Sequence, residues 1–411
     1  MGLVGAIVGF SGFLLACRLF GFAGRPAVVA LFGLGAYVTG LGLFACWLAH
    51  RRWRGASTGT TARSGPAGPT PGVSILKPLC GVDDGLEANL ESFLGLAHEP
   101  LQLLFGTRDA DDPAMAIARA VAARHPDRDV TFVAGIASDA ANPKIAIDEH
   151  LLPLARHPLV LLSDSNVRVA PGDLTALVDS MADERVGMVY QPVVSVGERD
   201  WVAALANLRF TEHSGVLAIA TRVFSGADPI TGKGMLCRRA ALASIGDLAA
   251  VRDVGLDDYL LGVELKRAGW RLHMATVPAL NVFENGSWRS FFQRQVRHAI
   301  WRFSMSGWLP LAEILMMPLV WSVAALFAGG PWAIPAALGT VAAKSALEDL
   351  AIGRLRAPGF AWRHKLLMPL KDVLMVVVWV LALFRHTVVW RDRTYRVDRS
   401  SRLYPVDPVH H

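Results

Sequence analysis

The stretch PLVLLSDSNVRV, residues 158–169, is the part of the sequence that decides the fold. Its apolar residues predict a buried strand over residues 159–164 that ends at Asp164, with Ser165 and Asn166 directly after it. An Asp at the end of a buried strand can hold a metal ion, form a turn, or do neither. Taken alone, Asp164 fits each alternative, so the segments around it have to distinguish them.

Strand-like and helix-like segments alternate on both sides of this stretch. Apolar runs typical of strands lie at residues 73–78, 101–109, 130–135 and 187–194. Helical patterns lie between and after them, at residues 84–95, 113–125 and 171–184. This alternation predicts a Rossmann-like α/β domain over residues 73–285, with a mostly parallel sheet covered by helices on both faces. Ligands of such sheets bind beyond the carboxyl ends of the strands, where we expect Asp109 and Asp164.

The composition indicates that this domain belongs to a membrane protein. Hydrophobic residues make up 53% of the 411 residues and charged residues only 18%, and the apolar excess lies at the two ends. Residues 27–49 carry no charge and are long enough to cross a bilayer core of roughly 30 Å. Basic residues follow at once, from His50 to Arg54, which predicts that the globular part faces the cytosol.

Further apolar segments complete the predicted organisation. Residues 2–17 are expected to form the first helix of a hairpin rather than a signal peptide. Residues 314–343 predict two helices, and residues 366–384 predict a third. If all three crossed the membrane, the basic tail would lie outside the cell, although basic residues favour the cytoplasmic side. One of the three is therefore expected to lie in the membrane interface or to re-enter. The predicted units are N-terminal transmembrane segments (1–54), a flexible linker (55–72), the catalytic domain (73–285), an interfacial amphipathic helix (286–305), C-terminal transmembrane helices (306–385) and a basic tail (386–411).

Charge and cysteine content indicate the kind of partner. The net charge of +6 and the pI near 9.3 arise largely from basic residues that flank apolar segments, which favours membrane lipids over nucleic acid as partners. The sequence contains no nucleic-acid-binding motif. The four cysteines have neither a CxxC pair nor metal-site spacing, so no disulfide framework is expected, which suits a cytosolic catalytic domain.

Three acidic clusters carry candidate chemistry. They are RDADDPA with Asp109 and Asp112, SDSN with Asp164, and LDDY with Asp257 and Asp258 at the start of an amphipathic helix. Each has a purely structural alternative, because Asp is a preferred N-cap and a common turn residue, and acids at a helix start are favoured by the helix dipole.

A basic cluster, RQVRH, places Arg294, Arg297 and His298 at spacings of three and four, and therefore on one face of a helix. Its structural alternatives are a membrane-surface face and a helix whose aromatic residues pack on the domain. Together with the acids, the cluster fits transfer from a nucleotide sugar. That reaction needs carboxylates for the nucleotide and a divalent cation, a carboxylate base, and cations for the departing diphosphate.

Ordered motifs between residues 73 and 302 resemble the ceramide glucosyltransferases, glycosyltransferase family 21, which have a GT-A fold. The motifs are VSILKPLCGVDDGLEANLESF, RDADDPA, ANPKI, SDSNVRV, FTEHSG, ITGKGMLCRR and LDDY. The resemblance implies a bacterial inner-membrane enzyme with its catalytic domain on the cytoplasmic face. It implies inverting transfer of a hexose from a UDP-sugar to the primary hydroxyl of ceramide, with Asp258 as general base and Mg²⁺ or Mn²⁺ at Asp164.

The resemblance also assigns the other site residues. Those expected to bind the nucleotide sugar are Lys77, Asp109, Asp112, Lys144, Asp164, Arg294 and Arg297. Those expected to bind the lipid acceptor are His213, Gly232, Asp257 and His298. Two positions depart from the family pattern. His298 stands where the family has a Trp, and Asn166 can be only a neutral metal ligand, so the diphosphate is expected to supply part of the metal affinity.

Other functions remain open at this point. Transfer of N-acetylglucosamine to a hopanoid would use the same order of motifs. A catalytically silent membrane protein that binds lipid is an alternative from another class, although it would have no need of the three acidic motifs and both arginines. A processive polysaccharide synthase is disfavoured, because its Gln-x-x-Arg-Trp signature is absent.

Overall fold

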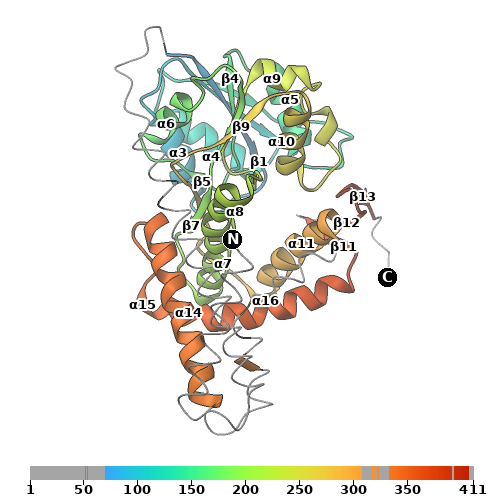
Figure 1. The fold of residues 1–411 in the computed structure, drawn as a ribbon. Coiled ribbons are helices and arrows are strands. Elements are labelled where there is room, and N and C mark those ends of the chain that lie inside the picture. Colours follow the sequence, from blue (N-terminus) through green and yellow to red (C-terminus); the bar gives the residue numbers. More distant parts are fainter. Residues whose placement is uncertain are drawn as a thin grey trace.

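The computed structural model describes residues 70–307, 333–390 and 393–406, together with isolated positions at 51, 53, 317, 319, 322 and 323. Its centre is a seven-stranded sheet in the order β3-β2-β1-β4-β8-β6-β9 (Figure 1). The strands are β1 Val73–Leu79, β2 Leu101–Thr107, β3 Asp129–Val133, β4 Leu159–Leu162, β6 Val186–Tyr190, β8 Met235–Arg238 and β9 Arg271–Met274. Only β8 runs antiparallel to its neighbours β4 and β6. The predicted mostly parallel sheet is therefore confirmed.

Helices cover both faces of this sheet. One face carries α3 Leu86–Leu94, α4 Pro113–Ala122 and α6 Asp173–Asp179, and the other carries α5 Ile145–Leu151, α9 Arg239–Ser244 and α10 Asp257–Arg267. Two one-turn 3-10 segments, Leu152–Leu154 and Ala249–Val251, lie in the connections of the second face. Strand β1 shows why two cores form: Ile75 packs into the first core and Leu76 into the second, as alternating side chains of a strand must.

A second, three-stranded sheet lies beside the first, in the order β5-β10-β7. Its strands are β5 Val167–Arg168, β7 Val193–Val196 and β10 Ala279–Val282. After β7 the chain forms one continuous helical rod made of α7 Trp201–Thr211, the π-helical turn Glu212–Leu217 and α8 Ala218–Ser225. A π-helical turn inside an α-helix is often found at a functional site.

The C-terminal part contains α11 Trp288–Ser306, α14 Ala333–Leu355, α15 Trp362–Lys365 and α16 Met368–Leu383 (Figure 1). Of these helices, α11 and α16 contribute to a third core, whereas Ile352 of α14 packs against Leu208 in a separate cluster. The helix expected over residues 286–305 corresponds to α11, which begins after the capping residue Ser287. Phe291 and Trp301 on this helix are buried in the protein, whereas Trp288 is 49% exposed. Most of the aromatic face of α11 therefore packs on the rest of the chain.

The segment expected as a basic tail is folded in the structure. It forms a three-stranded antiparallel sheet of β11 Thr387–Trp390, β12 Arg393–Val397 and β13 Leu403–Pro405, which we call the C-terminal sheet. Val388, Tyr395, Val397 and Leu403 are buried against α11 and α16. Along β12 the buried Tyr395 and Val397 alternate with the exposed Thr394 and Arg396, the period of two expected of a strand.

No helix within the described ranges has both the length and the apolar content that crossing a bilayer requires. The predicted transmembrane segments at 2–17 and 27–49 lie outside those ranges, as does most of 308–332. The segment predicted at 366–384 corresponds to the 16-residue helix α16, and Lys371 and Asp372 on it are buried. The transmembrane helices flanking the catalytic domain are thus not confirmed.

Candidate active site

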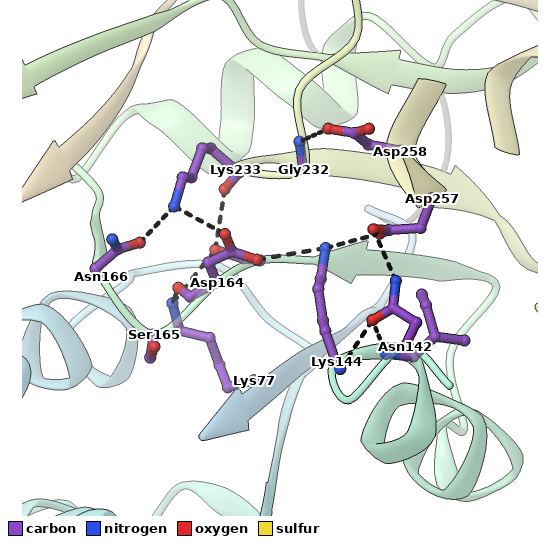
Figure 2. Close-up of polar contacts among 12 residues, drawn as sticks. Lys77, Asn142, Lys144, Asp164, Ser165, Asn166, Gly232, Lys233, Asp257 and Asp258 are labelled. Atoms are coloured by element: carbon purple, nitrogen blue, oxygen red, sulfur yellow. Dashed lines mark hydrogen bonds and ion pairs between the residues drawn. The ribbon is translucent and has the colours of Figure 1, made fainter. Parts of the chain in front are cut away.

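Asp164 lies just beyond β4, at the carboxyl edge of the sheet, and two lysines contact its carboxylate (Figure 2). Lys233 Nζ is 2.8 Å from Asp164 Oδ2, and Lys144 Nζ is 3.3 Å from Oδ1. Burial alone would raise the pKa of Asp164, but the two ammonium groups outweigh it and hold the pKa well below its ordinary value. Asp164 is therefore ionised and belongs to a cluster of charges.

Lys77 contacts the segment that carries Asp164. Its side chain is fully buried at the end of β1, and Nζ donates to the backbone oxygen of Asp164 at 2.6 Å and to Ser163 Oγ at 3.3 Å. The same ammonium lies 3.7 Å from the centre of the Phe93 ring. Burial lowers the pKa of Lys77 well below its ordinary value. Its contact with the backbone of Asp164 suits a residue that orients the strand end.

Lys144 connects the strand end to α10. Its Nζ lies 3.3 Å from Asp257 Oδ2 as well as from Asp164 Oδ1, so it bridges two carboxylates. Asn142 Nδ2 donates to Asp257 Oδ1 at 3.0 Å, and Asn142 Oδ1 accepts from the Lys144 N–H at 2.9 Å. Burial would lower the pKa of Lys144, but Asp257 and Asp164 raise it well above the ordinary value. The ANPKI motif thus brings two of the acidic clusters together.

Asp258 lies beside this network, in the first turn of α10. Its Oδ2 accepts from the Gly232 N–H and its Oδ1 from the Tyr259 N–H, both at 2.7 Å. Burial, and then the neighbouring charge of Asp257, raise the pKa of Asp258 to about 7. A Cβ at Gly232 would lie only 2.8 Å from Lys144 Nζ, so glycine at this position leaves room for the Lys144 ammonium. A carboxylate with a pKa near neutrality has the property that a general base needs.

The basic cluster of α11 lies on the other side of the site. The guanidinium of Arg294 lies against the rings of Phe210 and Phe283. Burial lowers the pKa of Arg294, while the negative charges of Asp83 and Asp164 act to raise it. The electrostatic influence of Asp164 indicates that Arg294 faces the same cluster. Arg297 instead donates to the backbone oxygen of Val389 in the C-terminal sheet at 3.0 Å.

His298 stacks on Trp301, with ring centres 5.8 Å apart and planes inclined by 29°. A Trp is therefore present one helical turn after the position where the family has it. Burial, followed by Arg297 and Arg294, lowers the pKa of His298 well below its ordinary value. His298 is accordingly neutral at pH 7 and acts as an aromatic rather than a cationic group.

The first acidic motif has a structural role in this state. Asp112 caps α4, where its Oδ1 accepts from the Ala114 N–H at 2.9 Å, and both its oxygens accept from the Gly81 N–H. Asp109 is exposed, and its carboxylate accepts from the Asp111 N–H at 3.0 Å. The two residues belong to the loop after β2, and no contact of either with Asp164 or Asp258 is found.

His213 lies in the π-helical turn, where burial and then Arg209 lower its pKa well below the ordinary value. Its neighbour Glu212 pairs with Lys371 Nζ of α16 at 2.6 Å. Among the described residues, the carboxylates of Glu212, Glu348 and Asp372 form a second acidic cluster, but Lys344 and Lys371 pair with it. This network joins the π-helical turn to α14 and α16, and it accounts for the buried charges of these helices.

Sequence reasoning missed three residues of the site. Lys233 lies within the quoted ITGKGMLCRR motif, of which only Gly232 was selected, and its Nζ also donates to Asn166 Oδ1 at 2.7 Å. Asp83 accepts a hydrogen bond from Ser165 Oγ. The carboxylate of Asp148 on α5 is fully buried and accepts no hydrogen bond, and burial raises its pKa to about 8. Nothing in the apolar pattern around Asp148 distinguishes it from an exposed helix residue.

A divalent cation can be tested against these side chains. Asp164 Oδ1 is buried and accepts no hydrogen bond, and its partner is the Lys144 ammonium at 3.3 Å, so a cation would take the place of this ion pair. Mg²⁺ commonly binds proteins through one or two carboxylates and takes its other ligands from substrate phosphates and water. The donor set fits an ion held jointly by Asp164 and a bound diphosphate.

The mostly parallel sheet, the acidic strand end and the surrounding cations are the arrangement expected of a glycosyltransferase with a GT-A-like fold, and the family match shows that class. The model of glycosyl transferase family 21 matches residues 34–403, so the chain belongs to this family. It is similar to ceramide glucosyltransferase 1 of Caenorhabditis elegans, with 25% identity over 348 residues, which cover 81% of this chain and 73% of the relative. The matched region ends within the C-terminal sheet, which is therefore part of the family's domain.

Two further similarities are more limited. Ceramide glucosyltransferase 3 of Caenorhabditis elegans is 28% identical over 249 residues, which cover 60% of this chain and about half, 53%, of the relative. A solved structure of a mannosyltransferase from Pyrobaculum calidifontis, in complex with GDP-mannose and Mn²⁺, gives a TM-score of 0.49 at 20% identity. That comparison covers 86% of this chain and 99% of the other.

Proposed function

We propose that this protein transfers a hexose from a UDP-sugar to the primary hydroxyl of ceramide, with inversion at the anomeric carbon. The observation that carries the proposal is the position of Asp258. A carboxyl group with a pKa of about 7 lies beside the network that Lys144 builds between Asp257 and Asp164. This arrangement combines a base for a hydroxyl group with positive charge for a leaving diphosphate.

In the proposed reaction, the acceptor oxygen attacks the anomeric carbon while the bond from that carbon to the diphosphate oxygen breaks. The hydroxyl proton passes to Asp258, whose two oxygens each retain a lone pair beside the hydrogen bonds from Gly232 and Tyr259. The attack comes from the face opposite the leaving group, so the configuration inverts. Lys144, Lys233 and Arg294 supply positive charge on the donor side, and Lys77 keeps Asp164 oriented.

Asp164 and Asn166 would hold the divalent cation, Mg²⁺ or Mn²⁺, which when bound neutralises charge on the diphosphate. Lys233 contacts both of these side chains, at 2.8 Å and 2.7 Å, and therefore fixes their orientation. The remaining expected donor residues, Asp109, Asp112 and Arg297, would contribute through the loop after β2 and through α11. His213, Gly232, Asp257 and His298 would line the acceptor side.

The acceptor is a lipid in this proposal, and α16 supports a site at the membrane surface. Along its outer face, exposed apolar side chains recur every three or four residues, at Leu370, Val373, Val377, Val380 and Phe384. The opposite face packs on α11, so α16 is apolar on both faces, and its outer face suits an apolar environment. We propose that α16 lies in the membrane interface on the cytoplasmic side, the role expected for one of the C-terminal segments.

The test is product formation by the purified full-length protein in detergent, offered labelled UDP-sugars with ceramide or with a hopanoid. We expect a glycosylated ceramide that is lost in Asp258→Asn, because removal of a positioned base costs about 10²- to 10⁴-fold in rate. Donor binding by calorimetry should persist in this variant. Transfer to the hopanoid alone would mean that the acceptor is a hopanoid and not ceramide. Undiminished transfer by Asp258→Asn would mean that Asp258 is not the base. No donor binding would exclude a transferase.

A further inference from the structure

The C-terminal sheet contacts the chain immediately before α10. Its turn at residues 398–402 lies against the loop 253–256, and main-chain hydrogen bonds connect the two. The Gly255 N–H donates to the Ser401 oxygen and the Leu403 N–H donates to the Asp253 oxygen, both at 2.8 Å. Val254 and Arg402 form an antiparallel bridge. A short two-stranded contact thus joins the far end of the chain to the loop that leads into Asp257 and Asp258.

Ser401 makes the contact closest to the helix. Its Oγ accepts from the N–H of Leu256, the N-cap residue of α10, at 3.2 Å. Leu256 has no side-chain acceptor to cap the helix, and the hydrogen bond to Ser401 instead holds the N–H of Leu256 itself, at the point where the loop enters the helix. Ser401 is fully buried and has a φ of 63°, a left-handed conformation that non-glycine residues rarely adopt.

Asp398 holds the turn in that conformation. Its Oδ1 accepts from the N–H groups of Ser400 and Arg402, both at 2.9 Å, and its Oδ2 accepts from Tyr404 Oη at 3.1 Å. A residue in the left-handed region persists when surrounding contacts impose it, and such residues are concentrated at functional sites. The turn is therefore a rigid support rather than a solvated end of the chain.

The loop 253–256 is held from its other side by the ANPKI segment. The Asn142 N–H donates to the Arg252 oxygen at 3.0 Å, and Asn142 Nδ2 donates both to the Val254 oxygen and to Asp257 Oδ1. Trp301 of α11 closes a third side, because a Cβ on Gly255 would lie 2.5 Å from its Nε1. The loop is thus enclosed by the turn, by Asn142 and by α11.

We propose that Ser401 is a positioning residue for the two carboxylates at the start of α10. The hydrogen bond from the Leu256 N–H to Ser401 fixes the position of the first turn of α10. That position determines the distance of Asp258 from Gly232 and the burial that raises the pKa of Asp258. This inference rests on the proposed function, since it takes Asp258 as the base of the transfer reaction.

The test compares Ser401→Gly with Ser400→Ala in the full-length protein. Glycine accepts a φ of 63° without strain, so Ser401→Gly removes the hydroxyl group but keeps the turn. Ser400→Ala removes the neighbouring, exposed hydroxyl, which contacts Asp398 and not the loop. The readouts are kcat for transfer from pH 5 to pH 9, donor affinity, and hydrogen exchange of the loop 253–256.

For Ser401→Gly we expect kcat to fall roughly 10- to 100-fold, as for a base displaced by about an ångström, with donor affinity unchanged. Exchange of the loop should accelerate. The acidic limb of the normalised pH profile should move to lower pH, because a more solvated Asp258 ionises more easily. Ser400→Ala should match the unmodified protein in all three readouts.

A Ser401→Gly protein with the unmodified pH limb and kcat would overturn the inference. Partial unfolding does not obscure the result if the folded fraction is measured at each pH and kcat is divided by it, because stability itself depends on pH. Asp258→Asn separates the two proposals. If Asp258→Asn abolishes transfer while Ser401→Gly behaves like the unmodified protein, only the positioning role fails, whereas an active Asp258→Asn protein removes the base itself.

Discussion

The pKa of Asp258 predicts a pH dependence that an ordinary aspartate would not give. With a pKa of about 7, roughly one tenth of the carboxylates are ionised at pH 6 and about one hundredth at pH 5. A base acts only when ionised, so kcat should rise about tenfold per pH unit below pH 6 and level off near pH 8. An unperturbed Asp, with a pKa of about 3.9, would leave kcat nearly constant from pH 5 to pH 8.

The variant Asp257→Asn tests the cause of this pKa. Burial is the largest contribution and remains, but the negative charge of Asp257, the second contribution, is removed. Removing a like charge favours the ionised form, so the acidic limb should move to lower pH. A shift of about one unit would correspond to about 1.4 kcal/mol between the two charge states. The amide oxygen of Asn can still accept from Asn142, which keeps the start of α10 in place.

The measurement is kcat with both substrates saturating, in buffers of constant ionic strength from pH 5 to pH 9. Donor affinity is measured separately at each pH, because the lysines around Asp164 are proposed to bind the donor as well. Two results would contradict the reasoning. One is a kcat that stays constant from pH 5 to pH 8, and the other is an acidic limb that moves to higher pH in Asp257→Asn.

Two further predictions concern donor binding. Lys233→Met should raise the donor Kd about 10- to 100-fold, since hydrogen bonds to charged groups contribute about 1.5–3 kcal/mol, and calorimetry with an unchanged Kd would exclude a donor contact. Asp112→Ala should lower the free energy of unfolding by about 1–2 kcal/mol through loss of the α4 cap, measured by denaturant unfolding. Asp112→Asn should keep the cap, so a loss of donor affinity in this variant would mean that Asp112 also binds the nucleotide.

The strand ends were predictable from the sequence, but the partner of Asp164 was not. Parallel strands buried on both faces are continuous apolar runs, and β1 and β4 therefore begin and end close to the predicted positions. Lys233 reaches Asp164 because β8 pairs with β4 in antiparallel register, with Leu162 opposite Met235. Two residues further along, that register sets Lys233 opposite Asp164. A sequence that predicts a mostly parallel sheet gives no sign of this one reversed strand.

The same limit applies to helix caps. The motif RDADDPA predicted both a nucleotide contact and a cap, and the structure gives Asp112 the cap. For α10 the pattern LDDY predicted the helix start but not its support, because Ser401 comes from a segment that is distant in sequence. Local patterns predict where an element begins, whereas contacts between distant segments decide how firmly its first residues are held.

The basic composition of residues 386–411 did not predict the C-terminal sheet, because an arginine side chain can pack against other residues as well as extend into solvent. The guanidinium of Arg396 lies 5.5 Å from the ring of Tyr404, and that of Arg297 lies 5.9 Å from the ring of Trp390. In such contacts the charge remains accessible while the planar group covers an aromatic surface. Counting arginines predicts a basic tail over residues 386–411, whereas Val388, Tyr395, Val397 and Leu403 in this segment are buried in a sheet. That sheet encloses the loop before Asp257, so the segment that composition assigns to the periphery lies next to the proposed base.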